Sequence, residues 1–326
     1  MTDLLVINKP INDPLSYCNY ILPHVSRSFA LGINTLSGQT RKSVLIGYLL
    51  CRIADTIEDD VKLSAEKKCL YLEEFVNCFS DKKKSSFISE IGHTLHGNSF
   101  HLDLVKNTHL VFDSFYALSK NSQSILIYWI KEMCFGMIKF IKKYPFGIRI
   151  ADITEYKEYC YYVAGTVGYM LTDIWKEYAY FIGPKRYEIL NKSAGIFGEA
   201  LQSVNILKDI AWDIENENAI FIPQSNLTEL SVHEIVNLTA NNMDISLEYI
   251  QNIPRINTSV RFFCIFPLLL AIATLREIKR SPSILKPLKK IKVSRDETKQ
   301  IYKNAYLASF SNCWLRKTAN KIRLIS

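Results

Sequence analysis

The sequence predicts an all-α fold, and three observations lead to that prediction. Only 12 glycines and 10 prolines interrupt its 326 residues, which is few for a fold of many short strands and tight turns. Apolar residues make up 48% of the chain and recur at helical spacing along successive segments. No strong linker, internal repeat or low-complexity stretch divides these segments. We therefore expect residues 1–326 to form a single helical domain.

Each expected helix depends on its apolar periodicity and on the residues that stop it. The segment 26–54 alternates apolar and small residues before an acidic cluster. A Tyr-Pro-Phe-Gly turn ends the helix expected at 122–142, and Gly183-Pro184 ends the one expected at 153–180. Residues 280–294 are basic and contain proline, so we expect a loop or flap there. The other expected helices are 65–79, 102–118, 185–214, 232–250, 259–279 and an amphipathic C-terminal one at 296–325.

The sequence predicts a cytoplasmic protein without a signal peptide or a transmembrane anchor. The first 13 residues lack the basic region and long apolar core of a secretory signal. The most apolar stretch, 262–275, is shorter than the roughly 20 residues that span a bilayer, and Arg261 and Arg276 flank it. It is expected to be a buried core helix. The eight cysteines show no paired spacing, so we interpret them as buried free thiols in a reducing compartment.

The chain is basic, with 40 Lys+Arg against 32 Asp+Glu and a net charge of +8. Such a surface favours polyanions, anionic membranes or phosphorylated small molecules. The sequence contains no recognisable nucleic-acid-binding motif, and its acidic clusters would repel a phosphate backbone. We expect no nucleic-acid partner, whereas peripheral contact with a membrane stays open.

Two clusters of carboxylates, about 150 residues apart, interrupt otherwise apolar helical sequence. Side chains four residues apart share a helix face, and like charges there are unfavourable unless something compensates them. Carboxylates on core-lining helices need a partner, and facing helices that carry oxygen ligands suit Mg²⁺. The clusters therefore predict a magnesium site, and the alternative is two solvated acidic faces. The shared faces are Asp55 with Asp59, and Asn205 with Asp209 and Asp213.

A cation lies beside the first pair of carboxylates. Tyr48, Arg52, Asp55 and Asp59 advance by four, three and four residues, so they form one stripe on a helix. A guanidinium there binds diphosphate oxygens in a bidentate way, although a simple salt bridge explains it too. The Ser26-Arg27-Ser28 segment adds a further cation and two hydroxyls, which a helix start explains equally well.

These residues lie in motifs that resemble the squalene/phytoene synthase family of head-to-head prenyl transferases. The motifs occur in the family's order and spacing, cover about residues 20–295, and imply the isoprenoid synthase fold with a central cavity. Two later stretches, 263–275 and 288–295, are similar to squalene synthases in particular. The four motifs are SRSFA (26–30), YLLCRIADTIEDD (48–60), YCYYVAGTVG (159–168) and LQSVNILKDIAWD (201–213).

The resemblance implies roles for individual residues. The catalytic residues would be Asp55, Asp59, Tyr159, Asp209 and Asp213. The Mg²⁺ ligands would be Asp55, Glu58, Asp59, Asn205, Asp209 and Asp213. The substrate diphosphates would contact Ser26, Arg27, Tyr48, Arg52, Gln202, Asn205 and Lys208. The chain departs from the family at Lys208, where an arginine is usual, and at 218–223, which lacks an arginine before Pro223.

The implied reaction joins two farnesyl diphosphates through presqualene diphosphate and reduces the product to squalene with NADPH. No GxGxxG fingerprint is present, so NADPH would bind outside a Rossmann site. Basic residues are expected to hold its phosphates, although a solvated loop or a membrane-surface patch explains them equally well. These residues are Lys289, Lys290, Lys292 and Arg295.

Two alternatives remain open. One is a synthase that needs no reductant and makes phytoene or dehydrosqualene, and the sequence does not distinguish farnesyl from geranylgeranyl substrates. The other is a non-catalytic relative that acts as an assembly or interaction factor, which would be expected to lose the aspartates. We expect a monomer.

Overall fold

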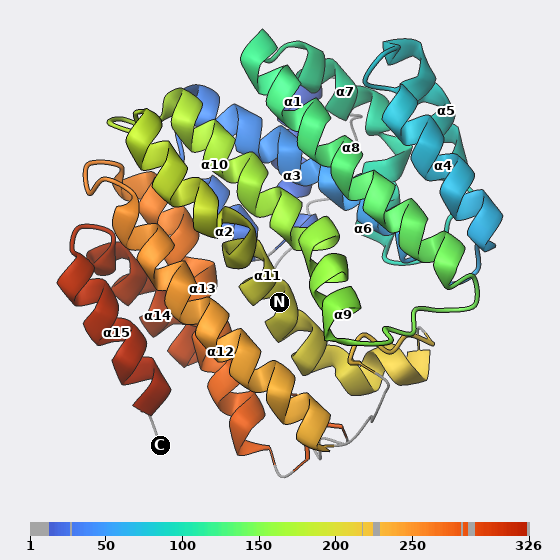
Figure 1. The fold of residues 1–326 in the computed structure, drawn as a ribbon. Coiled ribbons are helices and arrows are strands. Elements are labelled where there is room, and N and C mark those ends of the chain that lie inside the picture. Colours follow the sequence, from blue (N-terminus) through green and yellow to red (C-terminus); the bar gives the residue numbers. More distant parts are fainter. Residues whose placement is uncertain are drawn as a thin grey trace, which may run out of the picture.

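The computed structural model describes residues 13–26, 28–216, 218–223, 229–281, 283–285 and 291–324, with backbone alone at 229–230. The described part is helical apart from connecting turns and one isolated parallel bridge between Arg149 and Ile220 (Figure 1). The helices are α1 (Pro14–Val25), α2 (Ser28–Ile33), α3 (Gly38–Glu58), α4 (Ala65–Asn77), α5 (Ser85–Ile91), α6 (Ser99–Lys106), α7 (Thr108–Tyr116), α8 (Lys120–Lys143), α9 (Ile153–Cys160), α10 (Thr166–Tyr178), α11 (Pro184–Asn216), α12 (Glu229–Asn252), α13 (Thr258–Arg280), α14 (Arg295–Ala308) and α15 (Asn312–Leu324).

Local sequence sets the start of several helices. Asp13, Ser64, Asp152 and Ser294 each accept a hydrogen bond from a backbone N–H in the first turn of the following helix, as N-cap residues do. A π-helical turn, Tyr161–Gly165 (η2), joins α9 to α10. The helices expected from sequence at 65–79, 122–142, 185–214, 232–250 and 259–279 are confirmed to within a few residues, and the one expected at 153–180 contains the turn η2 between α9 and α10.

Three expected helices are interrupted. The segment 26–54 forms α2 and α3, and 102–118 forms α6 and α7. The expectation of one C-terminal helix at 296–325 is wrong, because the chain turns between α14 and α15. Arg261 donates hydrogen bonds to the carbonyl of Ser309 and to the side chain of Asn312, 2.7 Å each, and so satisfies acceptors at this turn.

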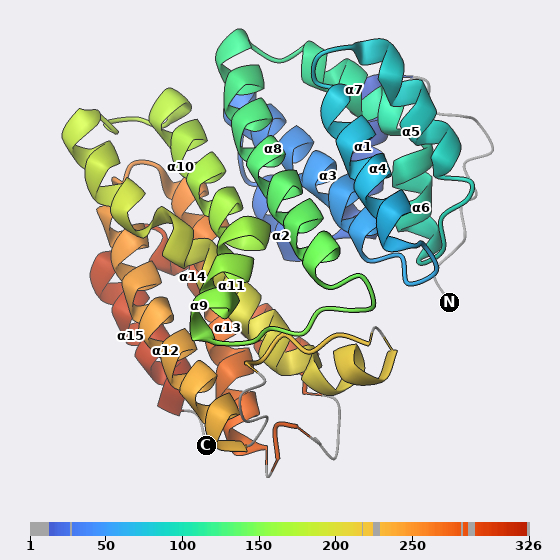
Figure 2. The ribbon, with the colours of Figure 1, turned by 45° about the vertical axis from the view of Figure 1, so that its right-hand side comes forward.

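The two halves of the chain meet where α3 and α8 pack against α10, where α8 packs against η2, and where α2 packs against α13 (Figure 2). Helix α13 packs against α2, α11, α12, α14 and α15. Within the described residues it is the one helix whose length and hydropathy would suffice to cross a membrane, and 72% of its most apolar window is buried inside the protein. The eight cysteines are free thiols, and seven are buried. The expected burial is wrong for Cys313, which lies on the exposed side of α15.

The crossing of the η2–α10 segment with α11 requires glycine. A Cβ at Gly168 would lie 2.0 Å from the carbonyl oxygen of Ala194, and one at Gly198 would lie 2.0 Å from that of Ala164. Only residues without a side chain allow two backbones to approach so closely. The η2–α10 segment therefore lies directly against α11, with backbone facing backbone.

Candidate active site

A cavity of about 170 Å³ lies between α3, α10, α11 and α13. Along α3 its lining runs from Val44 to Arg52 and Asp55, and along α11 it runs from Phe197 to Gln202 and Asn205. Both helices thus present apolar side chains first and polar ones towards their C-terminal ends. The cavity accordingly has an apolar body and a polar end. The remaining lining is mostly apolar and includes Phe29, Ile33, Met133, Val163, Leu171, Leu201, Phe263 and Pro267.

Arg52 lies at the polar end of this cavity with part of its hydrogen-bonding capacity unused. Its guanidinium is 3.4 Å from both a carboxylate oxygen of Asp55 and the hydroxyl of Tyr48. Tyr48 in turn donates to the carbonyl of Val25, 3.1 Å away. The buried Nε of Arg52 has no hydrogen-bond partner among the described residues. A buried unsatisfied donor is unfavourable unless a ligand accepts its proton, and a diphosphate oxygen is such an acceptor.

The carboxyl groups of Asp55 and Asp59 on α3 have raised pKa values. Burial raises the pKa of Asp55 to about 6, although Arg52 opposes the shift, and the charge of Asp59 adds to it. Burial also raises the pKa of Asp59, against the lowering effect of Arg52 and Lys68. A divalent cation beside these carboxylates would favour their ionised forms. The oxygen donors of this wall therefore fit a hard cation such as Mg²⁺.

Asp60, the next acidic residue of this cluster, has a structural role. Asp60 is 2% exposed and accepts hydrogen bonds from the backbone N–H groups of Lys62 and His96, at 2.8 and 2.7 Å. It fixes the turn after α3 and lies outside both cavities described in this section.

The second row of polar residues lies on α11. Asn205 is exposed and lines the cavity, and Asp209 and Asp213 follow one and two turns later. The ammonium of Lys208 lies 3.0 Å from the carboxylate of Asp209. In the part of the chain that the structure describes, no three His, Cys, Asp or Glu side chains come close enough to hold one metal ion. A cation held by either row would therefore draw its remaining ligands from water and from substrate oxygens.

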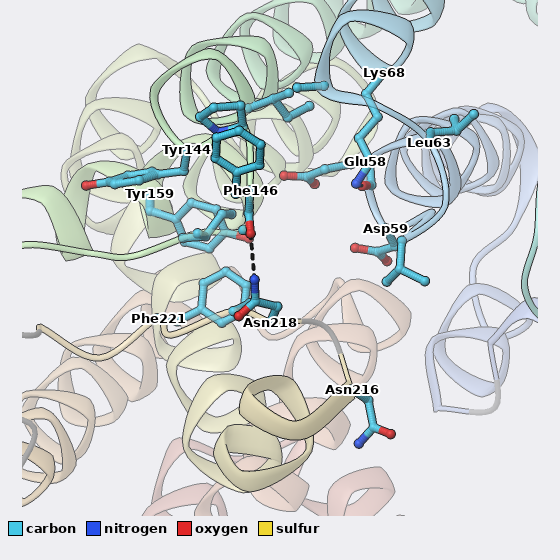
Figure 3. A pocket seen from close by; sticks show the side chains of 17 residues that line it. Glu58, Asp59, Leu63, Lys68, Tyr144, Phe146, Tyr159, Asn216, Asn218 and Phe221 are labelled. Carbon is cyan, nitrogen blue, oxygen red and sulfur yellow. Dashed lines mark hydrogen bonds between the residues drawn. The ribbon is translucent and has the colours of Figure 1, made fainter.

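A second cavity of about 380 Å³ begins where α3 ends (Figure 3). Glu58, Asp59 and Lys68 line one side, and aromatic side chains line the other. The ammonium of Lys68 donates to the backbone carbonyl of Glu58. Asn216, at the end of α11, also lines this cavity, so it adjoins both acidic helices. The aromatic residues are Tyr144, Phe146, Tyr159 and Phe221.

Two loops are joined at the rim of the second cavity. Asn218 has a left-handed backbone with φ of 48°, and its side chain donates to the carbonyl of Phe146 at 2.6 Å (Figure 3). Arg149 donates to the backbone and side chain of Asn218. Two backbone hydrogen bonds, 3.1 and 2.8 Å, connect Ile220 with Ile150 and Ile148. These bonds position Phe146 and Phe221 around the opening.

Tyr159 is buried in the aromatic wall of the second cavity. Its ring centroid lies 5.2 Å from that of Phe140 and 5.0 Å from that of Phe221. Burial raises its pKa well above the ordinary value, and the charges of Glu58 and Asp59 add to the shift. The phenol thus keeps its proton at neutral pH.

The structure brings many of the expected site residues together. Tyr48, Arg52, Asp55, Gln202 and Asn205 line the first cavity, and Glu58, Asp59 and Tyr159 line the second. Ser26 accepts a hydrogen bond from the N–H of Phe29 and so caps α2. Arg27, Lys289 and Lys290 lie outside the described residues. Lys292 and Arg295 are exposed and line neither cavity. Sequence reasoning missed Lys68, Phe146, Asn218 and Phe221.

An all-α fold that encloses an apolar cavity with Asp55 at its polar end agrees with the isoprenoid synthase fold that the sequence motifs imply. Residues 22–297 match the family model described as squalene/phytoene synthase. The chain therefore belongs to the squalene/phytoene synthase family, as its motifs indicated.

Similar proteins agree with this assignment. The Botryococcus squalene synthase of Botryococcus braunii is 27% identical over 94% of this chain and 67% of its own. The squalene synthase of Schizosaccharomyces pombe is 27% identical over 90% and 65%. The inactive squalene synthase 2 of Arabidopsis thaliana is 33% identical over 63% and 46%. The chain thus spans about two thirds or less of the length of these relatives.

Solved structures confirm the fold. A complex of TcSQS with the ligand E5700 superposes with a TM-score of 0.78 at 24% identity and covers 95% of this chain and 97% of that one. A dehydrosqualene synthase with bound ligand gives 0.61 at 22% identity and covers 91% and 97%.

Proposed function

We propose that the protein is a prenyltransferase that joins two farnesyl diphosphates head to head and, with NADPH, releases squalene. The observation that carries this proposal is the cavity that changes from apolar to polar along α3 and α11, with the unpartnered Nε of Arg52 at the junction. Such a cavity suits a molecule with a hydrocarbon tail and a diphosphate head.

The polar end would hold the diphosphate. Arg52 offers its free donor, Gln202 and Asn205 offer amides, and Lys208 adds a positive charge beside Asp209. Asp55, Glu58, Asp59, Asn205, Asp209 and Asp213 would hold Mg²⁺. When bound, this ion would neutralise the charge of the departing diphosphate. The arginine would bind the same oxygens and orient them.

The apolar body would protect the carbocation left when diphosphate departs. Water would quench that cation, so the cavity must exclude it. Aromatic rings of Phe29, Tyr48, Phe197 and Phe263 line the cavity, and aromatic faces stabilise cations. Tyr159, protonated and facing the second cavity from the side opposite Asp59, would donate a hydrogen bond to diphosphate oxygens during the rearrangement that follows the first condensation.

Several finer points belong to the same proposal. The exposed Lys292 and Arg295, together with Lys289 and Lys290, would hold the phosphates of NADPH. The protein would act as a monomer. We place the protein in the cytoplasm, in peripheral contact with a membrane that receives the apolar product.

Product analysis tests the proposal. The protein is incubated with farnesyl diphosphate and Mg²⁺, with and without NADPH, and the hexane extract is examined by gas chromatography and mass spectrometry. Squalene that appears only with NADPH supports it, and a chelator should abolish the product. A dehydrosqualene-type product whose amount does not depend on NADPH would contradict the proposal and support the reductant-free reaction.

A second series uses geranylgeranyl diphosphate to test for phytoene. If neither substrate is consumed by the folded protein, the non-catalytic alternative stands. The similarity to a relative named as inactive makes this control necessary.

A further inference from the structure

Exposed aromatic side chains surround the turn between α14 and α15. Tyr306, Phe310 and Trp314 are 58%, 50% and 46% exposed, and the rings of Tyr306 and Phe310 meet edge to face with centroids 5.5 Å apart. We call Tyr306, Leu307, Phe310 and Trp314 the aromatic turn. Apolar side chains that gather on a surface indicate a contact with another body, and the proposed reaction does not use these four.

Positive charge is concentrated along the two helices that the aromatic turn joins. Residues 291–324 contain eight Lys or Arg and two Asp or Glu, a net charge of +6 out of +8 for the whole chain. Helix α15 has four cations and no acidic residue. Arg323 pairs with Asp244 at 2.6 Å, whereas Arg316, Lys317 and Lys321 have no carboxylate partner among the described residues.

A groove of about 240 Å³ separates the two helices. Trp314, Lys317 and Lys321 line it together with the apolar side chains of Ile301 and Ile322. The carboxylate of Glu297, which also lines the groove, is paired with Arg276 at 2.8 Å. Aromatic, cationic and aliphatic groups therefore meet in one depression. This combination fits a molecule that carries both an anionic head group and hydrocarbon.

The same face lies behind the wall of the first cavity. Tyr302 of α14 packs against Phe262 and Phe266 of α13, with ring centroids 5.1 and 5.5 Å apart. On the same helix, Phe263 and Pro267 line the cavity. One helix thus separates the cavity from this surface, which forms an outer edge of the molecule (Figure 1).

We propose that the face formed by α14 and α15 binds the surface of an anionic phospholipid bilayer. Trp and Tyr side chains favour the boundary between head groups and acyl chains, and each Lys or Arg near an anionic surface adds attraction. The inference depends on this surface alone. Only its purpose, delivery of an apolar product to lipid, rests on the proposed function.

Vesicle sedimentation tests the charge component. The full chain is mixed with phosphatidylcholine vesicles, with or without phosphatidylserine, in the absence of substrate. We expect binding that requires phosphatidylserine and weakens with salt. The triple variant R316Q/K317Q/K321Q should lose on the order of 100-fold in affinity, since each cation accounts for about fivefold. The control K185Q/R186Q/K192Q removes the same charges from exposed positions on α11 and should bind normally.

A matched pair of variants tests the aromatic component. Y306A/F310A should weaken vesicle binding about tenfold, whereas Y128A/F135A, which removes a Tyr and a Phe of similar exposure from α8, should not. Circular dichroism melts confirm that each variant folds. Equal losses in test and control variants, or no dependence on phosphatidylserine, would overturn the proposal. So would a wild-type dimer that both test variants make monomeric. Squalene formation in detergent is measured separately, so a failed docking surface and a failed reaction give different results.

Discussion

Two arginines in this molecule differ in how many of their hydrogen-bond donors the fold satisfies. Arg261, on α13, is fully buried and donates four hydrogen bonds of 2.7–2.9 Å to the carbonyls of Ser309, Ile250 and Ile253 and to Asn312. Arg52, on α3, has contacts of 3.4 Å and a buried Nε with no partner among the described residues. Burial lowers the pKa of Arg261 to about 10, because its partners are mainly uncharged carbonyls.

The number of unsatisfied donors distinguishes a structural arginine from a ligand-binding one better than burial does. A guanidinium that directs four of its five N–H donors to the fold has little capacity left for a ligand. One that is desolvated but incompletely bonded has paid part of the cost of binding in advance. Substitution of Arg261 should therefore lower stability, whereas substitution of Arg52 should lower activity.

The largest expected effect is at two carboxylates, Asp55 beside Arg52 and Asp209 beside Lys208. Asp55→Asn and Asp209→Asn should each reduce turnover of farnesyl diphosphate at least about 1000-fold, because each removes charge needed to hold the cation. Diphosphate release measures the effect, and Asp296→Asn, at an exposed position on α14, is the control. Near-normal activity in either site variant would remove that residue from the site.

Arg261→Met should lower the free energy of unfolding by about 3 kcal/mol or more, since it removes the guanidinium that donates to the buried carbonyls of Ser309 and Ile253 and adds to the backbone donor of Ile250. Urea denaturation measures this loss, with the exposed Arg255→Met as a control. Activity per folded molecule should not change. A fully stable Arg261→Met would show that water or rearrangement replaces these hydrogen bonds.

Arg52→Lys keeps the charge but removes the planar donor pair. We expect a 10- to 100-fold decrease in kcat/KM, since a lysine cannot bind two diphosphate oxygens in the same geometry. The unfolding free energy should change by less than about 1 kcal/mol. If Arg52→Lys loses stability instead of activity, the contrast between the two arginines is wrong.

The smallest expected effect is a pH dependence. Burial raises the pKa of Asp55 from 3.8 to about 6, so the folded state binds this proton more tightly than the unfolded chain does. The resulting stability is present below the unfolded pKa and is lost as pH rises through about 6. Without Mg²⁺, Asp55→Asn should therefore exceed wild type by about 1–2 kcal/mol near neutral pH and match it near pH 4.

Thermal melts of wild type and Asp55→Asn across this pH range measure the difference. Added Mg²⁺ should stabilise wild type more than Asp55→Asn, because the cation binds the ionised carboxylate that the variant lacks. Asp55→Asn that is less stable than wild type at neutral pH would show that the ion pair with Arg52 outweighs the cost of burial.

Sequence predicted the features that arise locally. Helices such as α8, expected at 122–142 and observed at Lys120–Lys143, are set by periodicity and by a stop signal. The stripe from Tyr48 to Asp55 follows from helix geometry alone. The break after α14 was missed because Arg261, which donates hydrogen bonds to Ser309 and Asn312 at this turn, lies about 50 residues away in the sequence. The second cavity was missed because Lys68, Phe146 and Asn218 come from separate segments whose meeting is a tertiary event.

The glycine crossing between α10 and α11 has a consequence for how such a cavity can diverge. Where backbone touches backbone, no neighbouring side chain can shrink to accommodate a larger residue, so Gly168 and Gly198 allow no gradual change. Walls made of side chains, such as Val44, Leu171 and Phe263, can instead be enlarged or reduced one methylene at a time. Variation in the length of the accepted prenyl chain should accumulate on those walls, around an invariant crossing.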